Sequence, residues 1–354
     1  MAFVAISCSE SGRPGARVAM QPRHGSFDSL FRRVRLVTLE ESDSTLITGI
    51  ERIAVREADG VWAIPDRIEA AVRVYTPSGA LLHDLGRFGD GPGEFRLPRG
   101  VTFASDGSLL VADWVRPRLT RFGPSFAYDT SFNINVPAIF PVVAWGPNIL
   151  IGEDRFREDP AAPYWAVYDG RGRRRDAFHP LPAPLFENPY WRSVVGNETN
   201  SHTAVVLRDR IIVANALLYP LVAYEPGTWK GDSIGTPPPS WIPVPRVEPG
   251  HFRPPRQIKD FNRWRRSFST IDGVYALRDS LLVVAHKSFT RDSVEDSPLY
   301  HLDMYDAAYR KVLEDVRLPG RLLGIGDGLL IQLDGPPNPW TVGVFVPARV
   351  ADDG

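Results

Sequence analysis

The sequence predicts an all-β protein, a six-bladed β-propeller of four-stranded blades whose ring is closed by an N-terminal strand. Three observations predict this fold: six copies of one strand-and-turn pattern, a repeat length typical of a radial array, and an incomplete last copy that an early strand can complete. The 354 residues include 33 prolines and 30 glycines, which divide the chain into short strands rather than long helices.

Each copy of the pattern is a turn, an apolar strand and a terminal polar residue. The polar positions are Asp66, Asp113, Asp154, Asn215, His286 and Asp334. A further strand carrying an aromatic residue follows each of them, at Tyr75, Phe122, Tyr168, Tyr224, Tyr305 and Phe345. Another apolar run precedes each turn, as in RIAV and GVTF. Inner strand, second strand, aromatic strand and outer strand together make one propeller blade.

The two ends of the chain predict how the ring closes. The sixth copy stops near Val346, after its third strand, and lacks an outer strand. Residues 32–42, RRVRLVTLEES, alternate as an edge strand does and can supply the missing strand, which removes two exposed sheet edges. We therefore expect a signal-like remnant and polar tether over 1–31 and a propeller over 32–350, with inserts at about 180–201 and 236–269.

One stretch, Gly86–Asp113, is the best-preserved copy, and its residues resemble the NHL-repeat type of six-bladed propeller. The resemblance is carried by GRFG at 86–89, by GPGEF at 91–95 and by the later residues Pro98, Gly100-Val101, Asp106-Gly107, Val111-Ala112-Asp113, Arg118 and Phe122. The chain is also similar to bacterial, often secreted, six-bladed propellers of unassigned function. Most of these residues have structural roles, and Asp113 is expected to accept hydrogen bonds from backbone amides of the adjoining loop.

Composition excludes several classes of function. The net charge is −1, from 41 basic and 42 acidic residues, so no overall field attracts nucleic acid or an anionic membrane. The single cysteine, Cys8, excludes an intramolecular disulfide framework and a cysteine-based zinc site. No apolar run approaches the roughly 18 residues that span a bilayer. We expect a monomer.

The N-terminal residues MAFVAISC resemble the end of a bacterial lipoprotein signal, with Cys8 as the acylated residue. The apolar part is short, however, and no Lys or Arg precedes it. Two interpretations stay open: a periplasmic or outer-membrane-anchored lipoprotein whose only membrane attachment is a lipid on Cys8, and a cytoplasmic protein with a polar tail.

Both inserts join an outer strand to the next inner strand, on the face where propeller ligand sites usually lie. They are rich in aromatic and basic residues, which favours a cap over a pocket that binds an anionic ligand or a protein partner. The candidate ligand-binding residues are Arg99, His202, Trp241, Trp264 and Arg321. Alternatively, the inserts fill the channel mouth and brace the blades, and the run RWRR at 263–266 is a solvated face.

A metal site is the alternative interpretation, because some copies depart from the usual terminal Asp. Its candidate ligands are Glu153, Asn200, Asn215, His286 and Asp334. In residue type, Glu153, Asn200, Asn215 and Asp334 resemble the oxygen ligands of a divalent cation such as Ca²⁺ in propeller hydrolases of the gluconolactonase and paraoxonase kind. His202 with His286 resembles the Zn²⁺ ligands of propeller lyases.

Two functions therefore remain open. The leading hypothesis is a non-catalytic scaffold that binds a ligand or protein partner through its capped loop face. The alternative is a divalent-metal-dependent hydrolase or lyase acting in the central channel. No nucleophile, Walker or dinucleotide motif occurs in a fitting context, so no further cofactor is expected and the sequence does not decide whether the protein is an enzyme.

Overall fold

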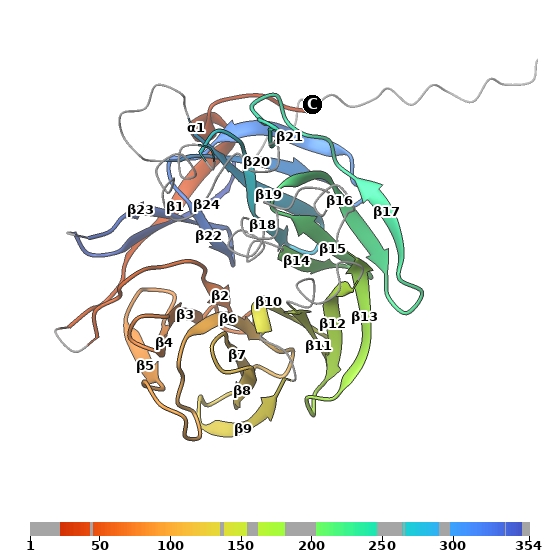
Figure 1. Ribbon diagram of the computed structural model, residues 1–354. Helices are drawn as coiled ribbons and strands as arrows, with labels where there is room; N and C mark the ends of the chain where they lie inside the picture. Colours follow the sequence, from red (N-terminus) through yellow and green to blue (C-terminus); the bar gives the residue numbers. More distant parts are fainter. Residues whose placement is uncertain are drawn as a thin grey trace, which may run out of the picture.

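The computed structural model describes residues 22–42, 45–134, 138–153, 162–180, 203–245, 264, 266–289, 298–336 and 338–348. They form six antiparallel sheets of four strands each, arranged in a ring (Figure 1). The predicted all-β six-bladed propeller is confirmed. The first strand of each blade lies nearest the centre of the ring and the fourth at its rim.

The blades follow one another along the chain, and each is built from inner to outer strand. Blade one is β2 (Ala54–Val55), β3 (Trp62–Asp66), β4 (Ala71–Tyr75) and β5 (Leu81–Leu85); blade two is β6 (Pro98–Phe103), β7 (Leu109–Asp113), β8 (Arg118–Phe122) and β9 (Tyr128–Asn133). Blade three is β10 (Ala138–Trp145), β11 (Asn148–Glu153), β12 (Pro163–Asp169) and β13 (Arg174–Pro180); blade four is β14 (Thr203–Leu207), β15 (Arg210–Asn215), β16 (Leu218–Glu225) and β17 (Lys230–Ile234). Blade five is β18 (Thr270–Leu277), β19 (Leu281–Ser288), β20 (Leu299–Tyr305) and β21 (Lys311–Arg317).

Blade six closes the ring with strands from both ends of the chain. It contains β22 (Leu322–Ile325), β23 (Leu329–Asp334), β24 (Thr341–Pro347) and, as its outer strand, β1 (Phe31–Thr38). β1 runs antiparallel to β24, with Phe31 opposite Pro347 and Thr38 opposite Thr341. The predicted closure is therefore confirmed. A short helix, α1 (Phe27–Leu30), leads into β1, and Arg23 pairs with Leu313 of blade five, so residues before the expected start at 32 also contact the blades.

Apolar cores between neighbouring blades hold the ring together. Blades one and two share a core that includes Val72 and Val111, and the core between blades six and one joins Leu330 to Trp62. Equivalent clusters lie between the four other pairs of neighbours. Because a blade is covered on both faces, its second strand carries apolar residues on both faces before the terminal polar residue, and every residue of β7 is buried.

The terminal acids of the first two copies have structural roles. Asp113 accepts hydrogen bonds from the backbone amides of Leu97 at 3.1 Å and Arg116 at 3.2 Å, together with those of Arg96 and Val115. Asp66 binds backbone amides in the same way and forms a buried ion pair with Arg73 at 3.0 Å. The expected role of Asp113 is confirmed: it ties the loop before the inner strand to the end of the second strand.

The long inserts lie where the sequence places them, between the outer strand of one blade and the inner strand of the next. The first joins β13 to β14 and the second joins β17 to β18. Of the second insert the structure describes 236–245, 264 and 266–269, whereas 181–202 and 246–263 lie outside the described residues, as do most positions of the helix expected there. No helix among the described residues is long and apolar enough to cross a bilayer.

Candidate functional site

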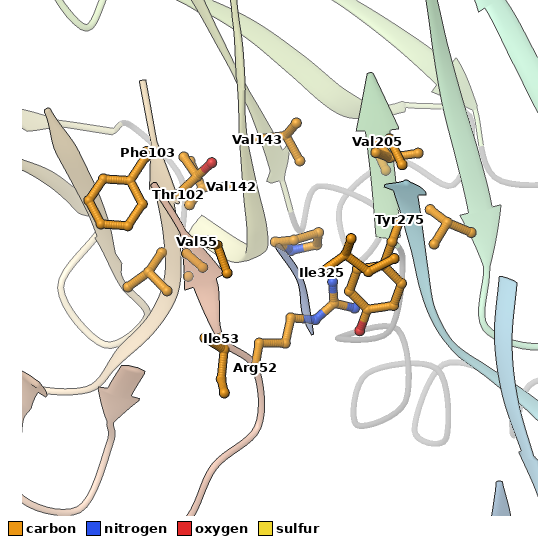
Figure 2. A pocket seen from close by; sticks show the side chains of 17 residues that line it. Arg52, Ile53, Val55, Thr102, Phe103, Val142, Val143, Val205, Tyr275 and Ile325 are labelled. Carbon is orange, nitrogen blue, oxygen red and sulfur yellow. The ribbon is translucent and has the colours of Figure 1, made fainter. Parts of the chain in front are cut away.

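The six inner strands enclose a central cavity of about 260 Å³. This is close to the lower end of small-molecule sites, which hold roughly 300–1,000 Å³. Figure 2 shows the side chains that line the cavity, with Arg52 extending from the β2 side toward Tyr275. Aliphatic side chains and polar groups contribute comparable shares of the wall, and the aliphatic residues include Ile53, Val55, Val101, Val142, Val143, Val205, Val274 and Ile325. Such a mixed wall offers contacts to both apolar and polar groups of a ligand.

Arg52 is the only charged residue in the described lining of this cavity. It precedes β2 of blade one, and its guanidinium reaches across the channel to blades four and five. There it donates hydrogen bonds to Thr203 Oγ1 at 3.3 Å and to the backbone oxygen of Asp272 at 3.1 Å. The guanidinium carbon also lies 5.6 Å from the centre of the Tyr275 ring. Arg52 thus marks the end of the cavity at which the inner strands begin.

An ion-pair network surrounds Asp272 at that same end of the channel. Arg321 donates two hydrogen bonds to the Asp272 carboxylate, at 2.8 and 3.2 Å, and Lys287 Nζ lies 3.4 Å from it. A bulge in the pairing of β18 with β19 falls between Ile271 and Gly273, at Asp272. Burial raises the pKa of the Asp272 carboxyl group, but the charges of Arg321, Lys287 and Arg52 outweigh burial and hold the pKa below its ordinary value.

A second ion pair at this end joins Glu51 to Arg99 at 3.5 Å, and Arg99 also lies over the Trp114 ring. Among the described residues, the two networks and the cavity contain more cations than carboxylates. The cations are Arg52, Arg67, Arg99, Lys287 and Arg321, and the carboxylates are Glu51 and Asp272.

The structure separates the predicted ligand-binding residues. Arg99 and Arg321 lie at the start of inner strands, near the cavity but in ion pairs beside it. Trp241 packs against Tyr219 with ring centres 4.9 Å apart, and Trp264 packs against Phe268 at 5.0 Å, so both brace the blades. His202 lies outside the described residues. None of the described candidates lines the central cavity itself.

Sequence reasoning missed Arg52 and Asp272. A signal for Arg52 is present, because an arginine stands at the start of three inner apolar runs, in RIAV at 52–55, RGVTF at 99–103 and RLLGI at 321–325. Arg99 and Arg321 are among the candidates named above, whereas Arg52 is not. For Asp272 no such signal exists, since its inward position follows from a bulge that alternation alone does not predict.

A second polar cluster lies in blade five, where His286 and His301 face each other on β19 and β20. Their rings stack with centres 5.2 Å apart, and the two residues are 0% and 9% exposed. Asp315 Oδ1 lies 2.9 Å from His301 Nδ1 and 3.7 Å from His286 Nε2. Burial lowers the pKa of His301 and the neighbouring His286 lowers it further, although Asp315 acts in the opposite direction.

The second insert covers this cluster. The backbone amide of Ser240 donates to Asp315 Oδ2 at 2.9 Å, and the Ser240 hydroxyl donates to Asp315 Oδ1. The same hydroxyl oxygen lies 3.3 Å from His286 Nε2, and the ring of Trp241 packs edge-on to His286 at 6.0 Å. The beginning of the insert is therefore fastened to blade five at this point.

The residues proposed as metal ligands lie at the ends of second strands in different blades and bind neighbours of their own. Glu153 accepts hydrogen bonds from Tyr168 and Arg174, Asn215 accepts one from the Leu217 amide, and Asp334 accepts one from the side chain of Asn338. Asn200 lies outside the described residues. Within the described chain, His and carboxylate ligand atoms converge in a group of three or more only at His286, His301 and Asp315, so Glu153 and Asp334 do not share a site with His286.

Comparison with known proteins finds the same fold. A family model described as a 6-bladed beta-propeller matches residues 18–139. The chain is similar to a Bacteroides fragilis protein inferred to be exported, with 13% identity and a TM-score of 0.64 over 92% of this chain and 97% of the other. It is also similar to a member of the DUF4221 family from Bacteroides vulgatus, with 9% identity and a TM-score of 0.65 over 90% and 98% of the two chains. A Bacteroides caccae protein of unknown function has 10% identity and a TM-score of 0.50 over 82% and 94%.

No curated protein matches the chain. At these identities the solved structures show the fold alone, and the expected likeness to bacterial six-bladed propellers of unassigned function is confirmed. The NHL-repeat assignment remains a resemblance carried by residues 86–122.

Proposed function

We propose that this propeller is a non-catalytic binding protein whose central channel takes a small amphipathic anion, with the anionic head on Arg52 and the apolar body among the aliphatic side chains. The observation that carries the proposal is the placement of Arg52, the only charged residue in the described lining, at one end of a cavity whose wall also contains aliphatic side chains such as Val142, Val205 and Ile325. A charged head and a hydrocarbon body match these two parts of the wall.

Among the described residues near Arg52, arginine and lysine side chains outnumber carboxylates, which supports an anion over a cation at this position. Arg52 donates to Thr203 Oγ1 and to the backbone oxygen of Asp272, and the Asp272 carboxylate is bound by Arg321 and Lys287. A ligand carboxylate can add charge-assisted hydrogen bonds to the guanidinium, worth roughly 1.5–3 kcal/mol. Each buried methylene contributes about 0.8 kcal/mol. After the cost of association, which is at least about 4 kcal/mol, we expect a medium-chain carboxylate to bind with a dissociation constant on the order of a millimolar.

Isothermal titration calorimetry with octanoate and octanamide tests the proposal. The two probes have the same hydrocarbon chain and differ in charge. We expect octanoate to bind with one site per chain and octanamide to bind at least about tenfold more weakly, because it lacks the charge that pairs with Arg52.

The matched variants are Arg52→Met and Arg67→Met. Both remove an arginine near the start of the first blade, but Arg67 is half exposed, pairs with Glu51 at 3.1 Å and does not line the cavity. Arg52→Met should reduce octanoate affinity by about tenfold or more, and Arg67→Met should leave it within about twofold. Equal affinity for the two probes, or equal loss in the two variants, would contradict the proposal.

We also propose that the protein acts outside the cytoplasm, held at a bacterial membrane by a lipid on Cys8. The sequence before Cys8 supports this, and so does the similar Bacteroides fragilis protein that is inferred to be exported. Fractionation of cells expressing the protein from its own gene, with radiolabelled palmitate, should give a labelled membrane-bound chain, and Cys8→Ser should lose the label. An unlabelled cytosolic wild-type protein would refute the anchor.

A further inference from the structure

The cluster in blade five differs from the corresponding place in the other blades. In blade two the end of the second strand pairs an acid with a base, with Asp113 opposite Arg118. In blade five the equivalent pair is two imidazoles, His286 opposite His301, and the acid comes from the outer strand as Asp315. In blades one and two the acid at this position, Asp66 or Asp113, binds backbone amides of the adjoining loop, so the structure of the blade does not itself require histidines there. The replacement puts two imidazoles where blade two has an acid and a base.

The backbone is bent to aim Asp315 at the two histidines. Asp315 has a φ of 54°, in the left-handed region that a non-glycine residue rarely adopts, and the pairing of β20 with β21 shifts register beside it. The buried carboxylate of Asp303 accepts the Asp315 backbone N–H at 2.7 Å, and Lys311 pairs with Asp303 at 3.3 Å. Strained residues and bulges that redirect a side chain are concentrated at functional sites. In blade five the left-handed backbone of Asp315 and the adjacent register shift direct the Asp315 carboxylate toward the two histidines.

We propose that His286 Nε2, His301 Nδ1 and Asp315 Oδ1 bind a divalent transition-metal ion of the Zn²⁺ type inside blade five, apart from the central channel. One ligand atom from each of the three residues lies within 4.8 Å of those of the other two. Zn²⁺ with bonds of about 2.0–2.2 Å in a tetrahedral arrangement separates its ligands by roughly 3.4 Å. The observed separations of 2.9 and 3.7 Å from Asp315 to the two imidazoles bracket that spacing.

The donor set selects the class of ion. Two imidazoles and one carboxylate suit Zn²⁺ and neighbouring transition metals, whereas Ca²⁺ and Mg²⁺ take oxygen ligands almost exclusively. Three protein ligands leave a fourth tetrahedral position, and the Ser240 hydroxyl stands beside it, 3.3 Å from His286 Nε2. Because Ser240 belongs to the second insert, an ion here would fasten that insert to blade five more firmly.

Metal binding by the tag-free full chain, stripped with chelator and then titrated with Zn²⁺, tests this site. We expect about one Zn²⁺ per chain by elemental analysis and a Zn²⁺-dependent rise of several degrees in the melting temperature. Co²⁺ loaded in its place should give the intense visible absorption of a low-coordinate nitrogen and oxygen site. This spectrum is a readout on the wild-type chain and requires no variant.

The variants are His301→Gln and Asp315→Asn, with His83→Ala as the matched control, because His83 is an exposed histidine on β5 outside the cluster. The first two should weaken Zn²⁺ binding by about 100-fold or more and keep the far-ultraviolet circular dichroism of the wild type, whereas His83→Ala should bind as the wild type does. Absence of stoichiometric binding to the wild-type chain, or undiminished binding in both cluster variants, would overturn the site. Octanoate binding is expected to be unchanged in these variants, which separates this proposal from the one for the channel.

Discussion

A chain that begins at residue 39, and so lacks β1, is expected to lose cooperative folding. The deletion leaves β24 as an exposed edge and removes Phe27, Leu30, Phe31 and Val37, all of which are buried. Burying each of these side chains contributes about 1.5–3 kcal/mol, so the loss is on the order of 10 kcal/mol and comparable to the whole stability of a typical domain. Differential scanning calorimetry and size-exclusion chromatography should show no native transition and an aggregated or expanded chain.

A pair of point substitutions in the same strand gives the matched control. Phe31 is 2% exposed and Leu36 is 56% exposed, although both lie in β1. Phe31→Ala should reduce the free energy of unfolding by about 3–5 kcal/mol, and Leu36→Ala should change it by no more than about 0.5 kcal/mol. A truncated chain that melts at the temperature of the full chain would show that β1 does not close the ring.

Replacement of Asp272 by alanine is expected to have the second largest effect. The side chain is 6% exposed and is the shared partner of Arg321 and Lys287. Removing one member of a buried ion pair leaves its partners unpaired and lowers the free energy of unfolding by about 3–5 kcal/mol. We expect a loss of about 3 kcal/mol here, because the side chains of Arg321 and Lys287 are both 26% exposed. Urea unfolding monitored by tryptophan fluorescence measures this difference.

The stabilisation by Asp272 should depend on pH in a defined direction. The pKa of Asp272 is lower in the folded chain than in the unfolded chain. The contribution of Asp272 to the free energy of unfolding is therefore complete at neutral pH and begins to decline as pH falls toward about 4. It is lost as pH falls through the folded-state pKa. The free energy of unfolding of Asp272→Asn should therefore fall less steeply than that of the wild type as pH is lowered below about 4. The control is Asp327→Asn, whose carboxylate pairs with Arg35 but is 80% exposed, and it should leave the curve almost unchanged. Identical acid limbs for the wild type and Asp272→Asn would contradict the role of the network.

Most of the fold could be predicted because every blade has the same local physical requirements, and these produce a similar sequence pattern in each copy of the repeat. Middle strands such as LLVAD must be apolar on both faces, and a terminal acid such as Asp113 must bind the loop amides. The closing strand could also be predicted, since RRVRLVTLEES has the alternation of an edge strand and the last copy lacks one. These features depend on residues that are close in sequence or on surroundings that are the same in every blade, so the sequence pattern is enough to predict them.

Less of the site could be predicted, because its residues meet through irregular backbone and across the ring. Arg52 belongs to blade one, but its partners Thr203 and Asp272 belong to blades four and five. His286 departs from the repeat, which makes it a candidate in the sequence, but its expected partner His202 lies outside the described residues. Its described neighbours His301 and Asp315 lie on other strands of blade five and do not stand out in the sequence. Asp315 lies in the outer strand KVLEDVR, where an acid is unremarkable, and only the bend at that residue turns it toward the histidines.

A crystal structure of the protein soaked with 8-bromooctanoate tests the central claim most directly, because the anomalous signal of bromine locates the end of the hydrocarbon chain. The channel proposal predicts the carboxylate on the Arg52 guanidinium and the bromine among the inner-strand side chains around Val142, Val205 and Ile325. Bromine density outside the central cavity, or a carboxylate bound away from Arg52, would contradict it.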